Sequence, residues 1–175
     1  MDGGIPHWRA LGFPVSMEWV KNRPSGYNFP DPADSSLVAT MDEVEGMIAP
    51  HRGVLMDTRS EVEHSGAEMK QGAFRAGTIP GSILYDWGNA VAFDKDQCLK
   101  DTAVLRQQLL ALGVHPTDTV ITFCHSGVRS AHTTFVLTQL LGMKNVRNYD
   151  GSWTEWSYHK ELPVQLDTNS ITILP

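Results

Sequence analysis

The stretch TVITFCHSGVRSAHTT at residues 119–134 decides the expected fold of this chain. Residues 119–123 form an apolar, β-branched run typical of a buried strand, and helical spacing begins at Ser130. Cys124 lies between them, on a loop that leads from a strand into a helix. Such a loop points backbone N–H groups inward, and the helix N-terminus adds positive potential, so the loop can hold a thiolate or an anion. This placement predicts that Cys124 is a nucleophile; the alternative is a buried structural cysteine at a strand end.

The residues that follow Cys124 are candidates for substrate binding. Gly127 allows the loop to turn without a Cβ clash, and Arg129 brings a positive charge that should lower the pKa of the thiol. Ser130 can donate a hydrogen bond to the sulfur, or it acts only as a helix cap. The His125 side chain should point outward, where it meets the tail of the substrate or lies in water. The candidates in this loop are His125, Ser126, Gly127, Val128, Arg129 and Ser130.

Three segments, in chain order, carry a resemblance to a known family. They are LMDTRSEVEH at residues 55–64, RAGTIPGSI at residues 75–83 and VITFCHSGVRSAHTTFVLTQLLGMKNVRNYDGSWTEW at residues 120–156. Together they resemble the rhodaneses, a family of sulfurtransferases, and above all the C-terminal catalytic domain of its tandem-domain members. The resemblance extends from residue 37 to about residue 165.

The resemblance implies a sulfurtransferase in which Cys124 carries the sulfur. Its thiolate would take a sulfane sulfur from a small anionic donor, hold it as a persulfide and pass it to a thiol or to cyanide. Thiosulfate is the favoured donor and 3-mercaptopyruvate the alternative, because the loop CHSGVRS matches neither donor group of the family cleanly. Neither a cofactor nor a metal is implied. The alternative from another class is a rhodanese-like module that binds or regulates without catalysis.

The length of the loop disfavours phosphoryl transfer. Four residues separate Cys124 from Arg129, and Phe123 stands where the phosphatase pattern has histidine. Related phosphatases and arsenate reductases have a loop one residue longer. By comparison with those families, the shorter loop suits a single sulfur atom and the longer one a tetrahedral oxyanion. A phosphatase or an arsenate reductase is therefore the weaker alternative.

Two arginines outside the loop complete the candidate substrate-binding residues. Arg59 matches a family position whose arginine faces the active-site pocket, although it could instead pair with Asp57 and hold the end of a strand. Arg75 precedes the turn at residues 77–81 and could face the pocket or lie in solvent.

Composition and charge exclude several other classes of protein. The 175 residues, 41% of them apolar, suffice for one sizeable core. A net charge of -6 argues against a nucleic-acid partner, which requires a basic face. No run approaches the roughly 18 apolar residues of a membrane span, and residues 1–10 show no export signal. Two distant cysteines, Cys98 and Cys124, predict a cytoplasmic protein without disulfides. The histidines lack ligand spacing, so no metal site is expected.

A short repeat links the two ends of the chain. DGGIPHW at residues 2–8, followed by PV at 14–15, matches DGSWTEW at residues 150–156, followed by PV at 163–164. The second copy follows the catalytic loop, so the first is expected to be the tail of a preceding rhodanese-like domain; the alternative is a coincidental turn. The expected organisation is a tail remnant at 1–15, a linker at 16–36 and a catalytic domain at 37–170. An upstream rhodanese-like domain or a second copy of this chain is the expected protein partner.

Strands and helices are expected to alternate through the catalytic domain. Thr40 and Glu43 should form a capping box, and Leu105, Leu109, Leu112, Ala131 and Phe135 should face the core. The fold class is α/β, of the rhodanese type, with a central, mostly parallel sheet flanked by helices on both faces. The expected strands are 37–39, 54–56, 82–84, 119–123 and 145–149, and the expected helices are 41–49, 102–112 and 130–141.

Overall fold

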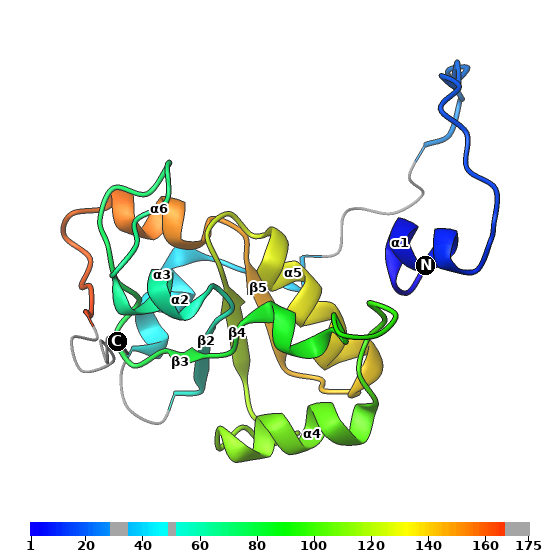
Figure 1. Ribbon diagram of the computed structural model, residues 1–175. Coiled ribbons are helices and arrows are strands. Elements are labelled where there is room, and N and C mark those ends of the chain that lie inside the picture. The colour runs from blue at the N-terminus through cyan, green and yellow to red at the C-terminus, as the bar shows by residue number, and fades with distance from the viewer. Residues whose placement is uncertain (29–34, 49–51, 167–175) are drawn as a thin grey trace, which may run out of the picture.

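The computed structural model describes residues 1–28, 35–48 and 52–166. Five parallel strands form one sheet in the order β1-β5-β4-β2-β3 (Figure 1). The strands are β1 (Val38–Ala39), β2 (Val54–Asp57), β3 (Ile83–Leu84), β4 (Val120–Phe123) and β5 (Val146–Tyr149). All four residues of the central strand β4 are buried, as expected for a strand that is covered on both faces.

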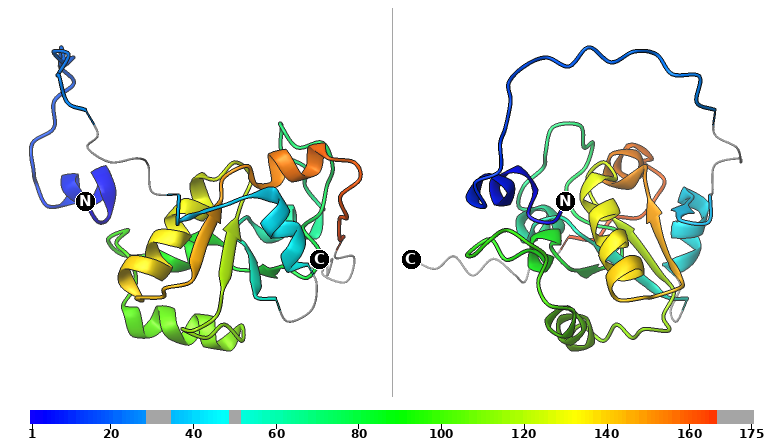
Figure 2. Two further views of the ribbon diagram at one scale, coloured as in Figure 1. Left: turned by 180° about the vertical axis from the view of Figure 1, so that it is seen from behind. Right: turned by 90° about the vertical axis from the view of Figure 1, so that its right-hand side faces the viewer.

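Helices pack on both faces of this sheet, which confirms the predicted fold class (Figure 2). The helices are α1 (Gly4–Ala10), α2 (Met41–Met47), α3 (Glu61–Ser65), the 3₁₀ helix η1 (Trp87–Ala90), α4 (Thr102–Ala111), α5 (Val128–Phe135), the π-helical turn η2 (Val136–Leu140) and α6 (Ser152–Tyr158). None of the helices in the described part of the chain has the length and apolar character that a membrane crossing requires.

Alternation along the strands creates two apolar cores. Met56 of β2 faces a cluster completed by Leu105 and Leu109 of α4 and Leu137 of η2. The next residue back, Leu55, faces the opposite cluster, which contains Val44 of α2 and the two tryptophans of α6. Neighbouring residues of a strand point to opposite faces, so one short apolar strand supplies both cores.

The expected capping box at Thr40 is confirmed. The Thr40 hydroxyl accepts a hydrogen bond from the Glu43 N–H, and the Glu43 carboxylate accepts one from the Thr40 N–H. The expected end of α2 at Ala49 lies outside the described residues.

Three core predictions on the helices were wrong. Ala131 is exposed, and Phe135 is 50% exposed, because the positions of α5 that face the sheet are taken by threonines. Thr134 hydrogen-bonds Thr122 of β4 at 2.7 Å, so a buried polar pair replaces the expected apolar contact. Leu112 is also exposed and lies one residue beyond the end of α4 at Ala111.

The two copies of the terminal repeat make the same contact. The Trp8 Nε1 donates to the Pro14 carbonyl at 2.9 Å, and the Trp156 Nε1 donates to the Pro163 carbonyl at 3.0 Å. Each tryptophan lies on a short helix, α1 or α6. Between the first copy and the sheet, residues 16–28 form neither helix nor strand, and part of the expected linker lies outside the described residues.

Candidate active site

Cys124 lies at the carboxyl end of the central strand β4, just before α5. This is the edge of a parallel sheet at which α/β proteins place their ligands. The residue is only 1% exposed. Helix α5 begins at Val128, two residues earlier than predicted, because Gly127 adopts a left-handed conformation and serves as its N-cap. The loop between strand and helix is therefore shorter than the sequence pattern suggested.

Gly127 is required by its conformation and by its surroundings. Its φ of 82° is in the left-handed region that favours glycine. A Cβ at this position would lie 2.9 Å from the Asp150 carbonyl oxygen and closer still to the Asp150 carboxylate. The predicted role of Gly127 in turning the loop fits this geometry.

Ser152, the first residue of α6, holds the cysteine loop through its hydroxyl. Its Oγ accepts hydrogen bonds from the N–H groups of Cys124 and Gly127, each at 3.1 Å. The same hydroxyl donates to the Tyr149 carbonyl at 2.7 Å. Two of the loop amides therefore point to Ser152 rather than to the sulfur, contrary to the expectation that successive amides of the loop face inward.

The start of α6 fixes the first two residues of the loop from the same side. The Trp153 N–H donates to the Cys124 carbonyl, and the Thr154 N–H donates to the His125 carbonyl, both at 3.0 Å. The Thr154 hydroxyl adds a second bond to the His125 carbonyl at 2.7 Å. The main chain at Cys124 is thus held in one position by a turn some thirty residues further along the chain.

Three other amides of the loop stabilise a thiolate. Burial raises the pKa of the Cys124 thiol, but hydrogen bonds from the N–H and hydroxyl of Ser130 and from the N–H groups of Ser126 and Arg129 outweigh it. The pKa of Cys124 is therefore lower than usual. The Ser130 hydroxyl also lies 3.0 Å from the Gly127 carbonyl, so its single proton can serve either partner.

Arg129 is paired with a buried carboxylate that the sequence analysis did not identify. Its two terminal nitrogens bind the two oxygens of Glu63 at 2.7 and 2.8 Å. Lys70 adds a further ion pair to Glu63 at 3.1 Å. Hydrogen bonds to Glu63 and the charges of Glu63 and Cys124 together raise the pKa of Arg129. The arginine therefore lies beside the sulfur, but its charge is largely balanced by Glu63.

Glu63 itself stays ionised. Burial raises its pKa, but the hydrogen bonds and charges of Arg129 and Lys70 hold that pKa well below the usual range. Glu63 is almost completely buried on the short helix α3, and its carboxylate also accepts a hydrogen bond from the Ser60 hydroxyl at 3.0 Å.

The other loop side chains face away from the sulfur to different degrees. His125 is partly buried rather than free in water, and its Nε2 lies 3.1 Å from the Gln71 carbonyl oxygen. Its Nδ1 is buried and has no hydrogen-bond partner among the described residues. Ser126 and Val128 are both exposed at the outer surface of the loop.

The structure does not bring Arg59 to the loop surface as a substrate ligand. Arg59 is 2% exposed, and its guanidinium binds Asp57 at 2.6 Å and the Gly77 carbonyl at 2.8 Å. It lies over the Phe123 and Trp153 rings. The alternative considered for this residue, a structural contact with Asp57, is the one observed.

Arg75 is likewise occupied by structural contacts. Its guanidinium donates to four backbone carbonyls that follow or belong to α6, those of Trp156, Ser157, His159 and Leu162. With four of its five N–H groups bonded in this way, the guanidinium fastens the end of α6.

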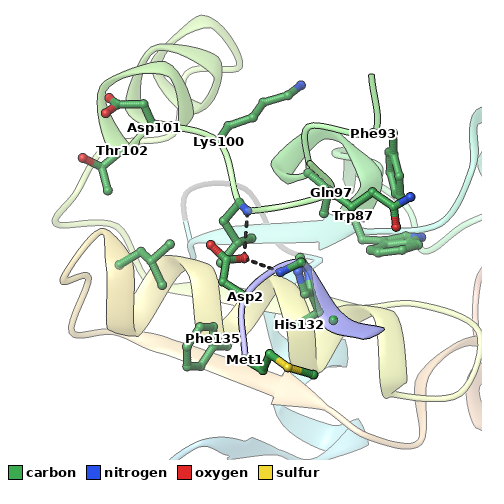
Figure 3. A pocket seen from close by; sticks show the side chains of 15 residues that line it. Met1, Asp2, Trp87, Phe93, Gln97, Lys100, Asp101, Thr102, His132 and Phe135 are labelled. Atoms are coloured by element: carbon green, nitrogen blue, oxygen red, sulfur yellow. Dashed lines mark hydrogen bonds between the residues drawn. The ribbon is translucent and has the colours of Figure 1, made fainter. Parts of the chain in front are cut away.

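A large groove lies elsewhere on the molecule, between the N-terminal segment and the body of the domain (Figure 3). Its volume is about 730 Å³, and Trp87, Phe93, His132 and Phe135 contribute side chains to it. Cys124 is not among its lining residues.

Comparison with known proteins places this geometry in a family. The model of a family described as "Rhodanese-like domain" matches residues 40–159. The chain is 36% identical over 173 residues to the "Sulfur carrier protein TtuD" of Thermus thermophilus, covering 94% of this chain and 60% of that protein. It is 33% identical over 177 residues to the "Thiosulfate sulfurtransferase" of Corynebacterium glutamicum, covering 97% of this chain and 58% of that protein. The chain thus spans about 60% of the length of these relatives.

Among solved structures, the fold is similar to that of wild-type EanB. The TM-score is 0.81 at 24% sequence identity, and the match covers 95% of this chain and 40% of that chain. At this identity the likeness concerns the fold alone.

Proposed function

The chain belongs to the family of rhodanese-like domains, and from this premise we propose that it is a sulfurtransferase that carries sulfur on Cys124. One observation supports this proposal above the others. The Cys124 sulfur lies at the carboxyl end of the central strand, where hydrogen bonds from Ser126, Arg129 and Ser130 lower its pKa. A thiolate at neutral pH is the form that attacks sulfur.

The reaction has two half-reactions. The Cys124 thiolate attacks the sulfur that the donor gives up, the bond that holds this sulfur to the rest of the donor breaks, and the remainder leaves with the bonding electron pair. For thiosulfate, the favoured donor, the bond that breaks is sulfur–sulfur and the leaving group is sulfite. For 3-mercaptopyruvate, it is carbon–sulfur, and the leaving group is the enolate of pyruvate, which takes up a proton to give pyruvate. A thiol or cyanide then attacks the terminal sulfur of the Cys124 persulfide, which regenerates the thiolate and gives ping-pong kinetics.

The surroundings of the loop favour a small anionic donor. Arg129 lies beside the sulfur, and Lys70, which is partly exposed, lies 3.1 Å from Glu63 in the same charge cluster. The amides of Ser126, Arg129 and Ser130 can stabilise negative charge on the sulfur throughout the reaction. Both cysteines are free thiols, which suits a reducing compartment such as the cytoplasm.

Intact-mass measurement tests the proposal directly. After incubation with thiosulfate, the protein should gain the mass of one sulfur atom, and peptide mapping should place it on the peptide that contains Cys124. Cys124→Ser should gain no sulfur, whereas Cys98→Ser, which removes the other thiol, should keep the gain. Cyanide should then remove the sulfur as thiocyanate. A protein that never gains sulfur would refute the proposal and favour a non-catalytic rhodanese-like module.

A comparison of donors tests the finer assignment. We expect a higher kcat/KM for thiosulfate than for 3-mercaptopyruvate. The opposite order would assign the chain to the other donor class while leaving the persulfide mechanism in place.

A further inference from the structure

A cluster of three metal-ligating side chains lies away from the Cys124 loop. His7 comes from α1, whereas Asp96 and Cys98 come from the turn that precedes α4. One ligand atom from each residue lies within 4.8 Å of the other two. About ninety positions separate His7 from the other two residues, so only the fold brings them together. The chemistry proposed for Cys124 uses none of them.

The N-terminal segment is seated on this turn by specific contacts. The Asp2 Oδ1 accepts a hydrogen bond from the Leu99 N–H at 2.9 Å and another from the Gly3 N–H (Figure 3). Gly3 has a φ of 71°, and a Cβ there would lie 2.9 Å from the Asp96 carbonyl oxygen. The contacts of Asp2 and Gly3 thus hold the segment that carries His7 against the turn.

The turn that carries Asp96 and Cys98 has defined backbone pairing of its own. The Ala92 N–H donates to the Cys98 carbonyl at 2.9 Å, and Val91 and Leu99 form an antiparallel bridge. The Asp96 Oδ1 accepts a hydrogen bond from the Cys98 N–H at 3.0 Å. The turn by itself therefore holds two of the three proposed ligands, Asp96 and Cys98, next to each other.

One nitrogen of the His7 imidazole lacks a hydrogen-bond partner among the described residues. The His7 Nδ1 is buried, and it has no hydrogen-bond partner in the part of the chain that the structure describes. A buried polar atom that forms no hydrogen bond costs free energy, and coordination to a cation would remove that cost. The carboxylates of Asp2 and Asp96 add negative charge beside the Cys98 thiol.

From this geometry we propose that His7, Asp96 and Cys98 bind a divalent transition-metal cation of the zinc class, which fastens the N-terminal segment to the catalytic domain. Imidazole nitrogen, thiolate sulfur and carboxylate oxygen are the ligands that Zn²⁺ takes in proteins, usually four at a time. Three protein ligands leave one position for water or for a further carboxylate.

Cobalt titration tests the ligand set, because Co²⁺ in a zinc site shows a thiolate charge-transfer band and tetrahedral visible bands. The whole chain carrying Cys124→Ser should bind one equivalent with these bands, which rules out the Cys124 loop as their source. Adding Cys98→Ser should abolish the charge-transfer band. His7→Ala and Asp96→Asn should each weaken Zn²⁺ binding in competition by more than the roughly 10- to 100-fold that outer-shell changes cause.

Two substitutions of exposed residues outside the cluster serve as matched controls. Asp94→Asn changes a neighbouring exposed carboxylate, and His115→Ala changes an exposed histidine elsewhere, so both should bind Co²⁺ unchanged. Absence of a thiolate band in the parent protein, or its persistence without Cys98, would overturn the proposal. Equal weakening by the control substitutions would do the same.

Hydrogen exchange tests the fastening. Zn²⁺ should slow amide exchange in residues 1–10, and this protection should disappear in Cys98→Ser. Unchanged exchange in the metal-bound protein would refute the role of the cation in fastening. Neither the cobalt titration nor the hydrogen-exchange experiment depends on sulfur transfer. Failure of the metal-site proposal can therefore be distinguished from failure of the proposed function.

Discussion

Replacing Ser152 with alanine is predicted to destabilise the protein and to loosen the cysteine loop. The substitution removes the acceptor of two buried N–H groups, those of Cys124 and Gly127, and the donor to Tyr149. A buried donor that loses its partner costs about 1–3 kcal/mol, so the two amides together cost about 2–6 kcal/mol. The left-handed backbone at Ser152, with a φ of 52°, strains serine and alanine equally. It therefore does not contribute to the difference in stability between the two proteins.

A second buried serine provides a matched control. Ser157 is equally buried, and its Oγ accepts one hydrogen bond, from the Phe74 N–H at 3.1 Å. Ser157→Ala should therefore cost about 1–3 kcal/mol, roughly half as much. Denaturant unfolding at fixed pH measures both free energies of unfolding.

Alkylation of the thiol against pH measures the effect on the site. In Ser152→Ala the loop amides should lose their fixed direction toward the sulfur, and the alkylation midpoint should rise toward the ordinary cysteine value of about 8.5. Ser157→Ala should leave the midpoint where it is. A loss of stability no larger than that of the control, together with an unchanged midpoint, would refute the role assigned to Ser152.

Three further predictions follow from the charges and the chain ends. Arg129→Ala should raise the alkylation midpoint of Cys124 and increase KM for thiosulfate; an unchanged profile would show that the guanidinium does not act on the sulfur. The pKa of Glu63 is lowered on folding, so its stabilising contribution is complete above about pH 4.3 and is lost as pH falls below that value. Glu63→Gln should accordingly destabilise the protein at pH 7 and reduce the dependence of the free energy of unfolding on pH below about pH 4.3. An unchanged dependence on pH would contradict this. Deletion of residues 1–15 should leave the domain folded and able to form a persulfide, while any self-association that light scattering detects weakens; a large drop in melting temperature would instead make the segment an integral part of the domain.

The strand, loop and helix around Cys124 could be predicted because their signals are local. An apolar run, a glycine and a helical pattern follow one another within a few residues, and the fold class follows from repeating that reasoning along the chain. The capping box at Thr40 was predictable for the same reason, since its two members are three residues apart.

The partners that complete the site could not be predicted in this way. Glu63 pairs with Arg129 from 66 positions away, and a glutamate on a five-residue helix has the pattern of a surface residue. One sequence signal could have indicated the special role of Ser152. The terminal repeat aligns it with Gly4, which has a φ of 59°, so the repeat marks position 152 as one that needs a left-handed backbone.

The surroundings of Arg59 and Arg75 could not be predicted from the sequence either. Arginine in a sequence is usually assigned to the surface or to a ligand, because an unpaired buried charge is costly. Here each guanidinium is buried or partly buried and paired with groups of the protein itself: Asp57 and Gly77 for Arg59, and the carbonyls around α6 for Arg75. The sequence shows that a charged side chain is present, but it does not show which acceptors the fold brings to that side chain.

The anchors of the cysteine loop make its length a property of two parts of the chain at once. Cys124 and His125 are bonded to Trp153 and Thr154, and Gly127 is bonded to Ser152. An additional residue inserted between His125 and Gly127 would shift one set of bonds out of register with the other. A change of chemistry that requires a larger loop would therefore require a compensating change at the start of α6. A substitution pathway, engineered or evolutionary, toward a loop that binds a larger anion must therefore alter the cysteine loop and the start of α6 together. Inserting one residue into the loop alone is expected to be unfavourable in this chain.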